Sequence, residues 1–232
     1  MTAPGADAAA GLVTAIRAAL RAAEDPARAP QMQAYMKSAL PYLGVPMPVT
    51  RRITRQAAAA CPPSGVPDLI DSAASLWRGA GYREERYAAT ELTGLRLAAG
   101  RPELLPLYTE MIVTGAWWDH VDPVSQRIGA LLSTHSNAVE PVIRAWSTDQ
   151  DRWLRRTSII CQLGRGPRTD TALLREVIEP NLTDPEFFVR KAIGWALRQY
   201  ARVDPDWVRA FVAEHAAVIS PLSRREALKH LS

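Results

Sequence analysis

One short segment near the middle of the chain combines side chains that could do chemistry. Trp117-Trp118-Asp119-His120-Val121-Asp122-Pro123 holds two tryptophans and two carboxylates. Trp118 and Asp122 are four residues apart, so on a helix they share a face. A carboxylate beside an aromatic ring can stabilise a developing cation. Adjacent tryptophans diverge on a helix, so we expect one to pack inside and the other to face outward.

Asp122 also has an ordinary structural interpretation. It directly precedes Pro123, and Asp at the N-cap followed by proline at the first helical position is a common way to begin a helix. The two roles are compatible, because a capping carboxylate can also face a groove. The pattern therefore predicts a helix over 123–134 with Asp122 at its start.

Two later segments place aromatic residues beside basic ones, as nucleic-acid grooves do. The first is Trp153-Leu154-Arg155-Arg156-Thr157, and the second covers 187–198. The second contains these aromatic and basic residues: Phe187, Phe188, Arg190, Lys191, Trp195 and Arg198. Taken alone, Trp195 after Gly194 is equally compatible with an ordinary core position.

Other site chemistries find little support in the sequence. The histidines have no paired metal-ligand spacing: His120, His135, His215 and His230. Cys61 and Cys161 are too few for a disulfide framework or a thiolate zinc site. No phosphate-binding glycine loop or nucleophile elbow is present. We expect neither a metal nor a cofactor.

Helical periodicity dominates the elements that must position these residues, and no alternating strand pattern appears. Prolines and glycines separate the candidate helices. The expected ranges are 8–23, 29–40, 48–60, 65–79, 83–98, 103–115, 123–134, 137–147, 150–164, 169–179, 184–202, 204–215 and 220–231. Many helices with short joints are typical of an all-α solenoid or bundle.

A repeat favours the solenoid. A basic residue followed by small and apolar residues recurs at Arg86, Arg127, Arg156, Lys191 and Arg225. The spacings of 41, 29, 35 and 34 residues are irregular but within the range of divergent HEAT-like helical repeats, which stack and line one concave surface. If these residues share a face, they form a positive stripe for a phosphate backbone. The alternative is that each begins a helix and is simply solvated.

Composition fits one folded domain over residues 1–232. The net charge of +4 permits a polyanionic partner, and only Lys37, Lys191 and Lys229 among 28 cationic residues are lysines. Arginine richness suits phosphate, but a GC-rich genome would explain it equally well, so composition alone is neutral. No apolar run of membrane-spanning length and no secretory signal pattern is present. We expect a cytoplasmic, nucleoid-associated monomer.

Taken together, the motifs resemble the AlkD family of alkylpurine DNA glycosylases along nearly the whole chain. The matching segments, in order, are Tyr35-Met36-Lys37, Pro41-Tyr-Leu-Gly-Val45, Arg83-Glu-Glu-Arg-Tyr87, the Trp-Trp-Asp-x-Val-Asp block, Trp153-Leu-x-Arg156, Phe187-Phe188 with Gly194-Trp195-Ala-Leu-Arg198, and the terminal Ser220-Pro-Leu-Ser-Arg-Arg-Glu-Ala-x-Lys-His-Leu. Their shared order and spacing are far more specific than any single motif.

The resemblance implies a HEAT-like solenoid with a concave DNA-binding groove. By motif, the catalytic Asp corresponds to Asp122, and the two tryptophans that pack on deoxyribose correspond to Trp118 and Trp195. The groove arginine corresponds to Arg156 and the lesion-side tyrosine to Tyr35. We also expect contacts to DNA from Lys37, Arg190 and Lys191.

The expected activity is base-excision repair of duplex DNA containing cationic N3- or N7-alkylated purines: 3-methyladenine, 7-methylguanine and bulky adducts. The resemblance implies that the modified base stays stacked instead of being flipped. Two alternatives remain open. One is a catalytically silent HEAT-like module that binds damaged or branched DNA, and the other is a protein–protein scaffold.

Overall fold

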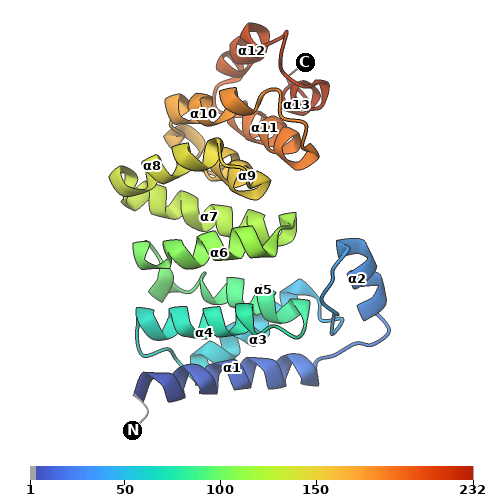
Figure 1. Ribbon diagram of the computed structural model, residues 1–232, viewed down its shortest axis with the longest axis vertical. Helices are drawn as coiled ribbons and strands as arrows, with labels where there is room; N and C mark the ends of the chain where they lie inside the picture. Colours follow the sequence, from blue (N-terminus) through green and yellow to red (C-terminus); the bar gives the residue numbers. More distant parts are fainter. Residues whose placement is uncertain (1–3, 232) are drawn as a thin grey trace. The chain divides into compact units, whose positions relative to one another are not determined.

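The computed structural model describes residues 4–231, with side chains from residue 9 onward. Every regular element within this range is a helix (Figure 1). The prediction of an all-α fold is therefore confirmed. These residues form two compact units that divide between Leu107 and Tyr108. The expectation of a single domain over residues 1–232 depends on how the two units combine, and it stays a prediction.

The first unit consists of four packed α-helices and one that has no buried residue. Its elements are α1 (Pro4–Ala22), α2 (Ala29–Met36), α3 (Met47–Ala60), α4 (Val66–Arg78), α5 (Arg83–Leu92), η1 (Arg96–Ala98) and η2 (Pro102–Leu104). Helix α1 packs on α3, α4 and α5 through Leu12, Ile16 and Leu20, which follow one helical stripe and are fully buried. Helix α2 lies to one side of these helices (Figure 1).

The second unit is a stack of short helices, each packed on its neighbours. Helix α6 (Leu105–Gly115) crosses the boundary between the units. The other elements are α7 (Trp118–Thr134), α8 (Ser136–Ser147), α9 (Arg152–Ile160), η3 (Gly166–Arg168), α10 (Thr171–Ile178), η4 (Glu179–Asn181), α11 (Phe187–Tyr200), α12 (Pro205–Glu214) and α13 (Pro221–Ala227). Helices α7, α9, α11 and α13 form one row in which each packs on the next, while α8 packs on α10. Paired, stacked helices of this kind are a helical-repeat architecture.

Local sequence signals explain where several of these helices begin. Asp151, Asp170, Asp204 and Ser220 precede α9, α10, α12 and α13, and each side chain accepts a hydrogen bond from a backbone N–H of the first helical turn. Such caps satisfy N–H groups that a helix cannot pair internally. Proline follows at the start of α12 and α13, where its missing N–H costs nothing.

The predicted start of the helix over 123–134 was wrong. Helix α7 begins at Trp118, with Trp117 as its N-cap residue, and Pro123 lies inside it. Asp122 is therefore a helical residue and not a cap. Burial of Val121 and Val124, both fully hidden from solvent, outweighs the hydrogen bond that an interior proline removes.

None of the helices among residues 4–231 is both long enough and apolar enough to span a lipid bilayer.

Candidate active site

The centre of the candidate site is a paired carboxylate and guanidinium on neighbouring helices of the second unit. Arg156 of α9 donates from Nε to Asp122 Oδ1 at 2.8 Å and from Nη2 to Oδ2 at 2.9 Å. Arg156 also donates from Nη1 to the carbonyl oxygen of Phe188 on α11, at 2.7 Å. The side chain of Arg156 is 5% exposed and that of Asp122 is 18% exposed. A bidentate pair of this kind fixes the orientation of the carboxylate.

Burial and charge act in opposite directions on the carboxyl group of Asp122. Loss of hydration raises the pKa of Asp122 above its ordinary value, and the Arg156 hydrogen bonds and charge lower it again. The nearby carboxylate of Asp119 adds a smaller contribution that raises the pKa of Asp122. Removing Arg156 would therefore leave only influences that favour the protonated form.

Aromatic rings surround the Arg156 guanidinium. Its Cζ lies 5.9 Å from the ring centroid of Trp195 and 6.0 Å from that of Phe188, the outer range for a cation–π contact. Trp195 is half-buried on α11. Trp118 is half-buried at the first position of α7, one helical turn before Asp122. The structure thus brings Asp122, Arg156 and Trp195 together, with Trp118 on the helical face of Asp122.

The other tryptophan of the pair belongs to an aromatic cluster. The Trp117 ring centroid lies 6.2 Å from that of Trp153 and 5.4 Å from that of Phe188. Trp153 and Phe188 are themselves 5.0 Å apart, and Phe187 packs edge-on against Phe188 while remaining 52% exposed. This cluster joins the starts of α7, α9 and α11, which are the three helices that carry the site.

A glycine allows the backbones of α7 and α9 to approach closely. A Cβ atom at Gly129 of α7 would lie only 2.0 Å from the carbonyl oxygen of Cys161, which follows α9. Only a glycine fits there without a shift of backbone. The close approach helps to bring Asp122 on α7 within hydrogen-bonding distance of Arg156 on α9.

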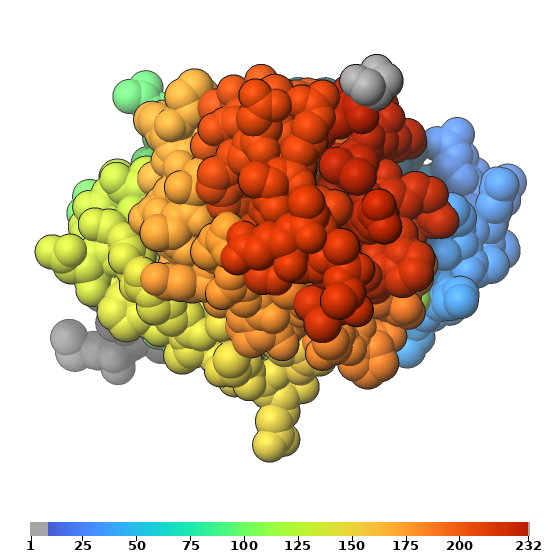
Figure 2. Space-filling model, turned by 90° about the horizontal axis from the view of Figure 1, so that it is seen from above, coloured from blue at the N-terminus to red at the C-terminus, as the bar shows by residue number. Residues whose placement is uncertain are grey.

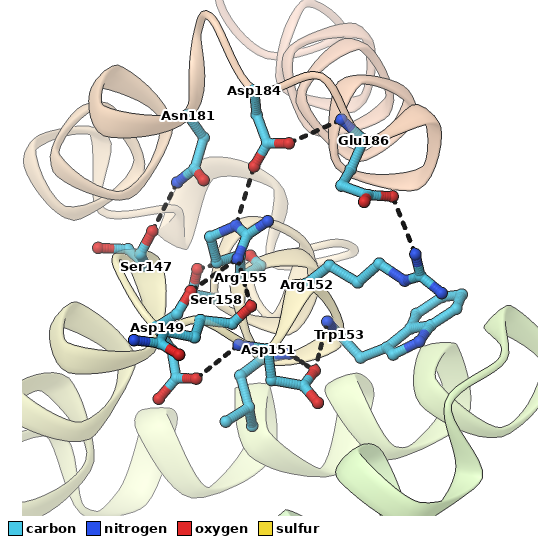
Figure 3. Close-up of polar contacts among 12 residues, drawn as sticks. Ser147, Asp149, Asp151, Arg152, Trp153, Arg155, Ser158, Asn181, Asp184 and Glu186 are labelled. Carbon is cyan, nitrogen blue, oxygen red and sulfur yellow. Dashed lines mark hydrogen bonds and ion pairs between the residues drawn. The ribbon is translucent and has the colours of Figure 1, made fainter.

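A polar network holds the start of α11 against the loop that precedes α9 (Figure 3). Arg155 donates from Nε to Asp184 Oδ2 at 2.8 Å and from Nη1 to the carbonyl oxygens of Asp149 and Gln150. Asp184 Oδ1 accepts the backbone N–H of Glu186 at 2.8 Å, one residue before α11. Because Phe188 lies in the first turn of α11, this network fixes the carbonyl oxygen that Arg156 binds.

The predicted DNA-binding residues lie in both units. Tyr35, near the end of α2, is 74% exposed, and the C-cap residue Lys37 has a left-handed conformation with φ +50°. Arg190 and Lys191 are half-buried on α11. Their contacts with DNA stay predictions.

The repeated basic residues of the second unit lie on successive helices of the α7–α13 row, but none begins its helix. Arg127 lies in α7, Arg156 in α9, Lys191 in α11 and Arg225 in α13. The alternative was therefore wrong for these four residues in having each one begin a helix, although the solvation that it expected holds for Arg225, which is exposed. Two of them are engaged by carboxylates: Arg156 by Asp122 and Lys191 by Glu226.

A buried carboxylate supports the loop that follows α2. Glu84 of α5 is fully buried and accepts hydrogen bonds from the backbone N–H groups of Leu43, Gly44 and Val45, at 2.9 to 3.1 Å. Gly44 has φ +86°, and a Cβ atom there would lie 2.1 Å from the carbonyl oxygen of Asp25. Desolvation raises the pKa of Glu84, while the three N–H donors lower it.

One group of side chains among residues 9–231 is close enough to share a cation: Glu179, Glu214 and His215. Arg175 already pairs with both glutamates, at 2.9 and 2.8 Å, so one positive charge of the protein offsets part of their charge. These residues lie on η4, α12 and the end of α12, and not on the helices that carry Asp122 and Arg156.

Sequence reasoning missed several partners of the predicted residues. These are the Phe188 carbonyl oxygen, the Arg155–Asp184 pair and Glu226, which binds Lys191 and Arg198. Each partner lies 28 to 35 residues away along the chain, as in the separation of 32 for Arg156 and Phe188. A separation of about one helical repeat was the available signal, since stacked repeats contact their neighbours.

The fold and the site define an all-α helical-repeat protein with an aromatic-flanked carboxylate–arginine pair. The family model described as DNA alkylation repair enzyme matches residues 16–231, and the chain belongs to this family. It is similar to a solved structure described as a predicted DNA alkylation repair enzyme from Enterococcus faecalis. The two share 29% identity over 90% of this chain and 97% of that chain, with a TM-score of 0.80. No curated relative matches. The predicted family is thereby confirmed, and with it a role in the repair of alkylated DNA.

Proposed function

We propose that the protein is a DNA glycosylase that hydrolyses the N-glycosidic bond of N3- and N7-alkylated purines in duplex DNA. The observation that carries this proposal is the Asp122–Arg156 pair beside the ring of Trp195. Family membership supplies the class of damage, and the pair supplies a fixed carboxylate suited to the reaction.

The chemistry of the lesion explains why a carboxylate would suffice. A purine alkylated at N3 or N7 carries a positive charge, so it leaves as a neutral base and needs no general acid. The deoxyribose becomes cationic as the glycosidic bond stretches. An ionised Asp122 would stabilise that charge and could orient the water that attacks the sugar carbon. The faces of Trp118 and Trp195 would add cation–π stabilisation, worth roughly 0.5–2 kcal/mol each.

Arg156 would have two tasks in this scheme. In the free protein it orients Asp122 and favours its ionised form. A guanidinium has five N–H groups, and three are used by Asp122 and Phe188. The remaining two are the ones with which Arg156 would contact a backbone phosphate and fix the register of the strand.

We further propose that the modified base stays stacked during excision. A carboxylate that acts on the sugar does not need to enclose the base, so 3-methyladenine, 7-methylguanine and bulky adducts would all be accepted. The protein would bind the duplex as a monomer, with contacts from Tyr35, Lys37, Arg190 and Lys191. Neutral lesions such as uracil would be poor substrates, because their leaving group is worse.

Base release from a duplex containing 7-methylguanine tests the proposal. The wild type should release the base, and Asp122→Asn should bind the duplex but lose most of the release. Asp206→Asn is a matched control, since Asp206 lies on α12, is 89% exposed and pairs only with Arg209 among the described residues. Duplex binding without release by the wild type would contradict the glycosylase and favour a catalytically silent DNA-binding module.

A further inference from the structure

Two cations flank Trp195 on one face of α11. Lys191, Trp195 and Arg198 occupy positions i, i+4 and i+7, so their side chains project from the same side of the helix. The side chains of Lys191 and Arg198 remain 39% and 24% exposed. Because Trp195 adjoins Arg156, these cations lie next to the proposed active site.

Both cations are bound by a single carboxylate from the next helix of the row. Glu226 of α13 pairs through Oε1 with Lys191 Nζ at 3.1 Å and through Oε2 with Arg198 Nη1. The Glu226 side chain is only 14% exposed. The hydrogen bond from Lys191, with a further contribution from Arg198, lowers the pKa of Glu226, so the carboxylate is charged at neutral pH.

Close packing fixes this carboxylate in place. A Cβ atom at Gly194 of α11 would lie 2.4 Å from the Cβ of Glu226 and 2.9 Å from the carbonyl oxygen of Ser223. Ser223 Oγ donates to the carbonyl oxygen of Arg190 at 2.9 Å. Helix α13 is thus anchored on α11 at the end of the second unit that Figure 2 shows in orange and red.

An anion that bridges a lysine and an arginine occupies a position suited to phosphate, since both side chains are common phosphate ligands. We propose that Lys191 and Arg198 form a subsite for a phosphodiester of the DNA backbone, which Glu226 fills in the DNA-free protein. This inference rests on the proposed function. Binding of a duplex would exchange the Glu226 carboxylate for a phosphate. Glu226 would therefore weaken binding to damaged and undamaged DNA alike, and contacts at the lesion would account for most of the discrimination between them.

Duplex affinity measured against salt concentration tests the inference. The full-length Glu226→Gln protein should bind an undamaged duplex about three- to tenfold more tightly than the wild type at moderate salt. The slope of log affinity against log salt should stay near that of the wild type, because the duplex contacts the same phosphates in both proteins and only the wild type must displace Glu226. Glu214→Gln is the matched control, because it removes the same charge from a more exposed pair between Glu214 on α12 and Arg175 on α10. The control should bind as the wild type does.

A double-mutant cycle separates the subsite from a purely structural role. In a Lys191→Gln, Arg198→Gln background, Glu226→Gln should bring no gain in affinity. Unchanged or weaker binding by folded Glu226→Gln, with normal wild-type binding, would overturn the inference and leave the glycosylase proposal intact. Absence of salt-dependent duplex binding by the wild type would overturn both.

A spectroscopic readout on the wild type makes the test independent of how well Glu226→Gln folds. The Nη–H signals of Arg198 and the Nζ–H signal of Lys191 in nitrogen-15 NMR spectra should shift when a duplex is added, as the carboxylate is replaced by phosphate. A signal that stays unchanged while other signals of α11 shift would show that Glu226 keeps its partners, and it would overturn the inference.

Discussion

The guanidinium of Arg156 holds both carboxylate oxygens of Asp122, at 2.8 and 2.9 Å. Burial raises the pKa of Asp122, and Arg156 is the main influence that lowers it. The proposed reaction needs the ionised carboxylate. The pH dependence of excision should therefore show how strongly Arg156 favours the ionised form of Asp122.

We predict that excision by the wild type falls as the pH drops through the raised pKa of Asp122, above the value of about 3.9 for a free Asp. Arg156→Ala should move this acid limb to still higher pH, because only influences that raise the pKa of Asp122 remain. Single-turnover release of 7-methylguanine between about pH 4 and pH 8, corrected for release without enzyme, measures both limbs. If the acid sides of the two pH profiles coincide, Asp122 is not the group whose ionisation controls excision.

The carboxyl group of Asp122 should also change the free energy of unfolding with pH, in the direction opposite to that of most carboxylates. The pKa of Asp122 is higher in the folded than in the unfolded protein, so the folded state binds its proton more tightly. This carboxyl group therefore stabilises the fold below its pKa in the unfolded chain, and that contribution is lost as the pH rises through its pKa in the folded protein. Asp122→Asn should remove that pH-dependent contribution. Urea titration across this pH range measures the free energy of unfolding of both proteins. The difference between variant and wild type should change with pH if Asp122 makes this contribution.

The Arg155–Asp184 pair should act as a positioning element for the site. Asp184→Asn should lower the free energy of unfolding by about 2–3 kcal/mol, because a largely buried charged hydrogen bond is lost. If the start of α11 then moves, the Phe188 carbonyl oxygen no longer meets Arg156, and excision should fall even where the protein is fully folded. Asp206→Asn serves again as the exposed control. Equal effects of the two variants on both quantities would argue against this role.

Much of the fold could be predicted from the sequence because its signals are local. Prolines and capping residues gave helix boundaries within a few residues, as for α12 after Asp204. The failure at α7 had the same origin, since Asp122-Pro123 carries a local start signal that burial of Val121 overrides. The pairing of Asp122 with Arg156 leaves no trace in periodicity or composition. Asp122 stood out beside Trp118 and Arg156 in the basic repeat, but only the family resemblance assigned both to one site.

Glu84 should be essential to the loop that follows α2. In Glu84→Gln, the amide oxygen can still accept from Leu43, Gly44 and Val45 in the place of Oε1. The NH₂ group in the place of Oε2 cannot accept the second bond from the Leu43 N–H, and the charge that strengthens the other bonds is lost. We expect a loss of about 2–3 kcal/mol in the free energy of unfolding, measured by urea titration. The control Glu103→Gln changes an exposed residue and should be nearly neutral. Similar losses in both variants would contradict the prediction.

Gly194 should be required for the contact between α11 and α13. Gly194→Ala places a methyl group against Glu226 and the Ser223 backbone, and relief of that overlap should cost about 1–3 kcal/mol. Gly11→Ala on α1 is the matched control, because a Cβ atom there meets nothing within 4 Å and helix propensity favours alanine. Thermal unfolding compares the two. A Gly194→Ala protein as stable as the control would mean that α13 is free to shift.

The side-chain caps of α9, α10, α12 and α13 also bear on how the second unit assembles. Each of these helices carries its own start signal, and it packs mainly on helices close to it in sequence. Contacts over short stretches of chain close with little loss of entropy and form early. Folding can therefore begin at any helical pair and spread outward, and damage to a single cap would fray one pair before its neighbours.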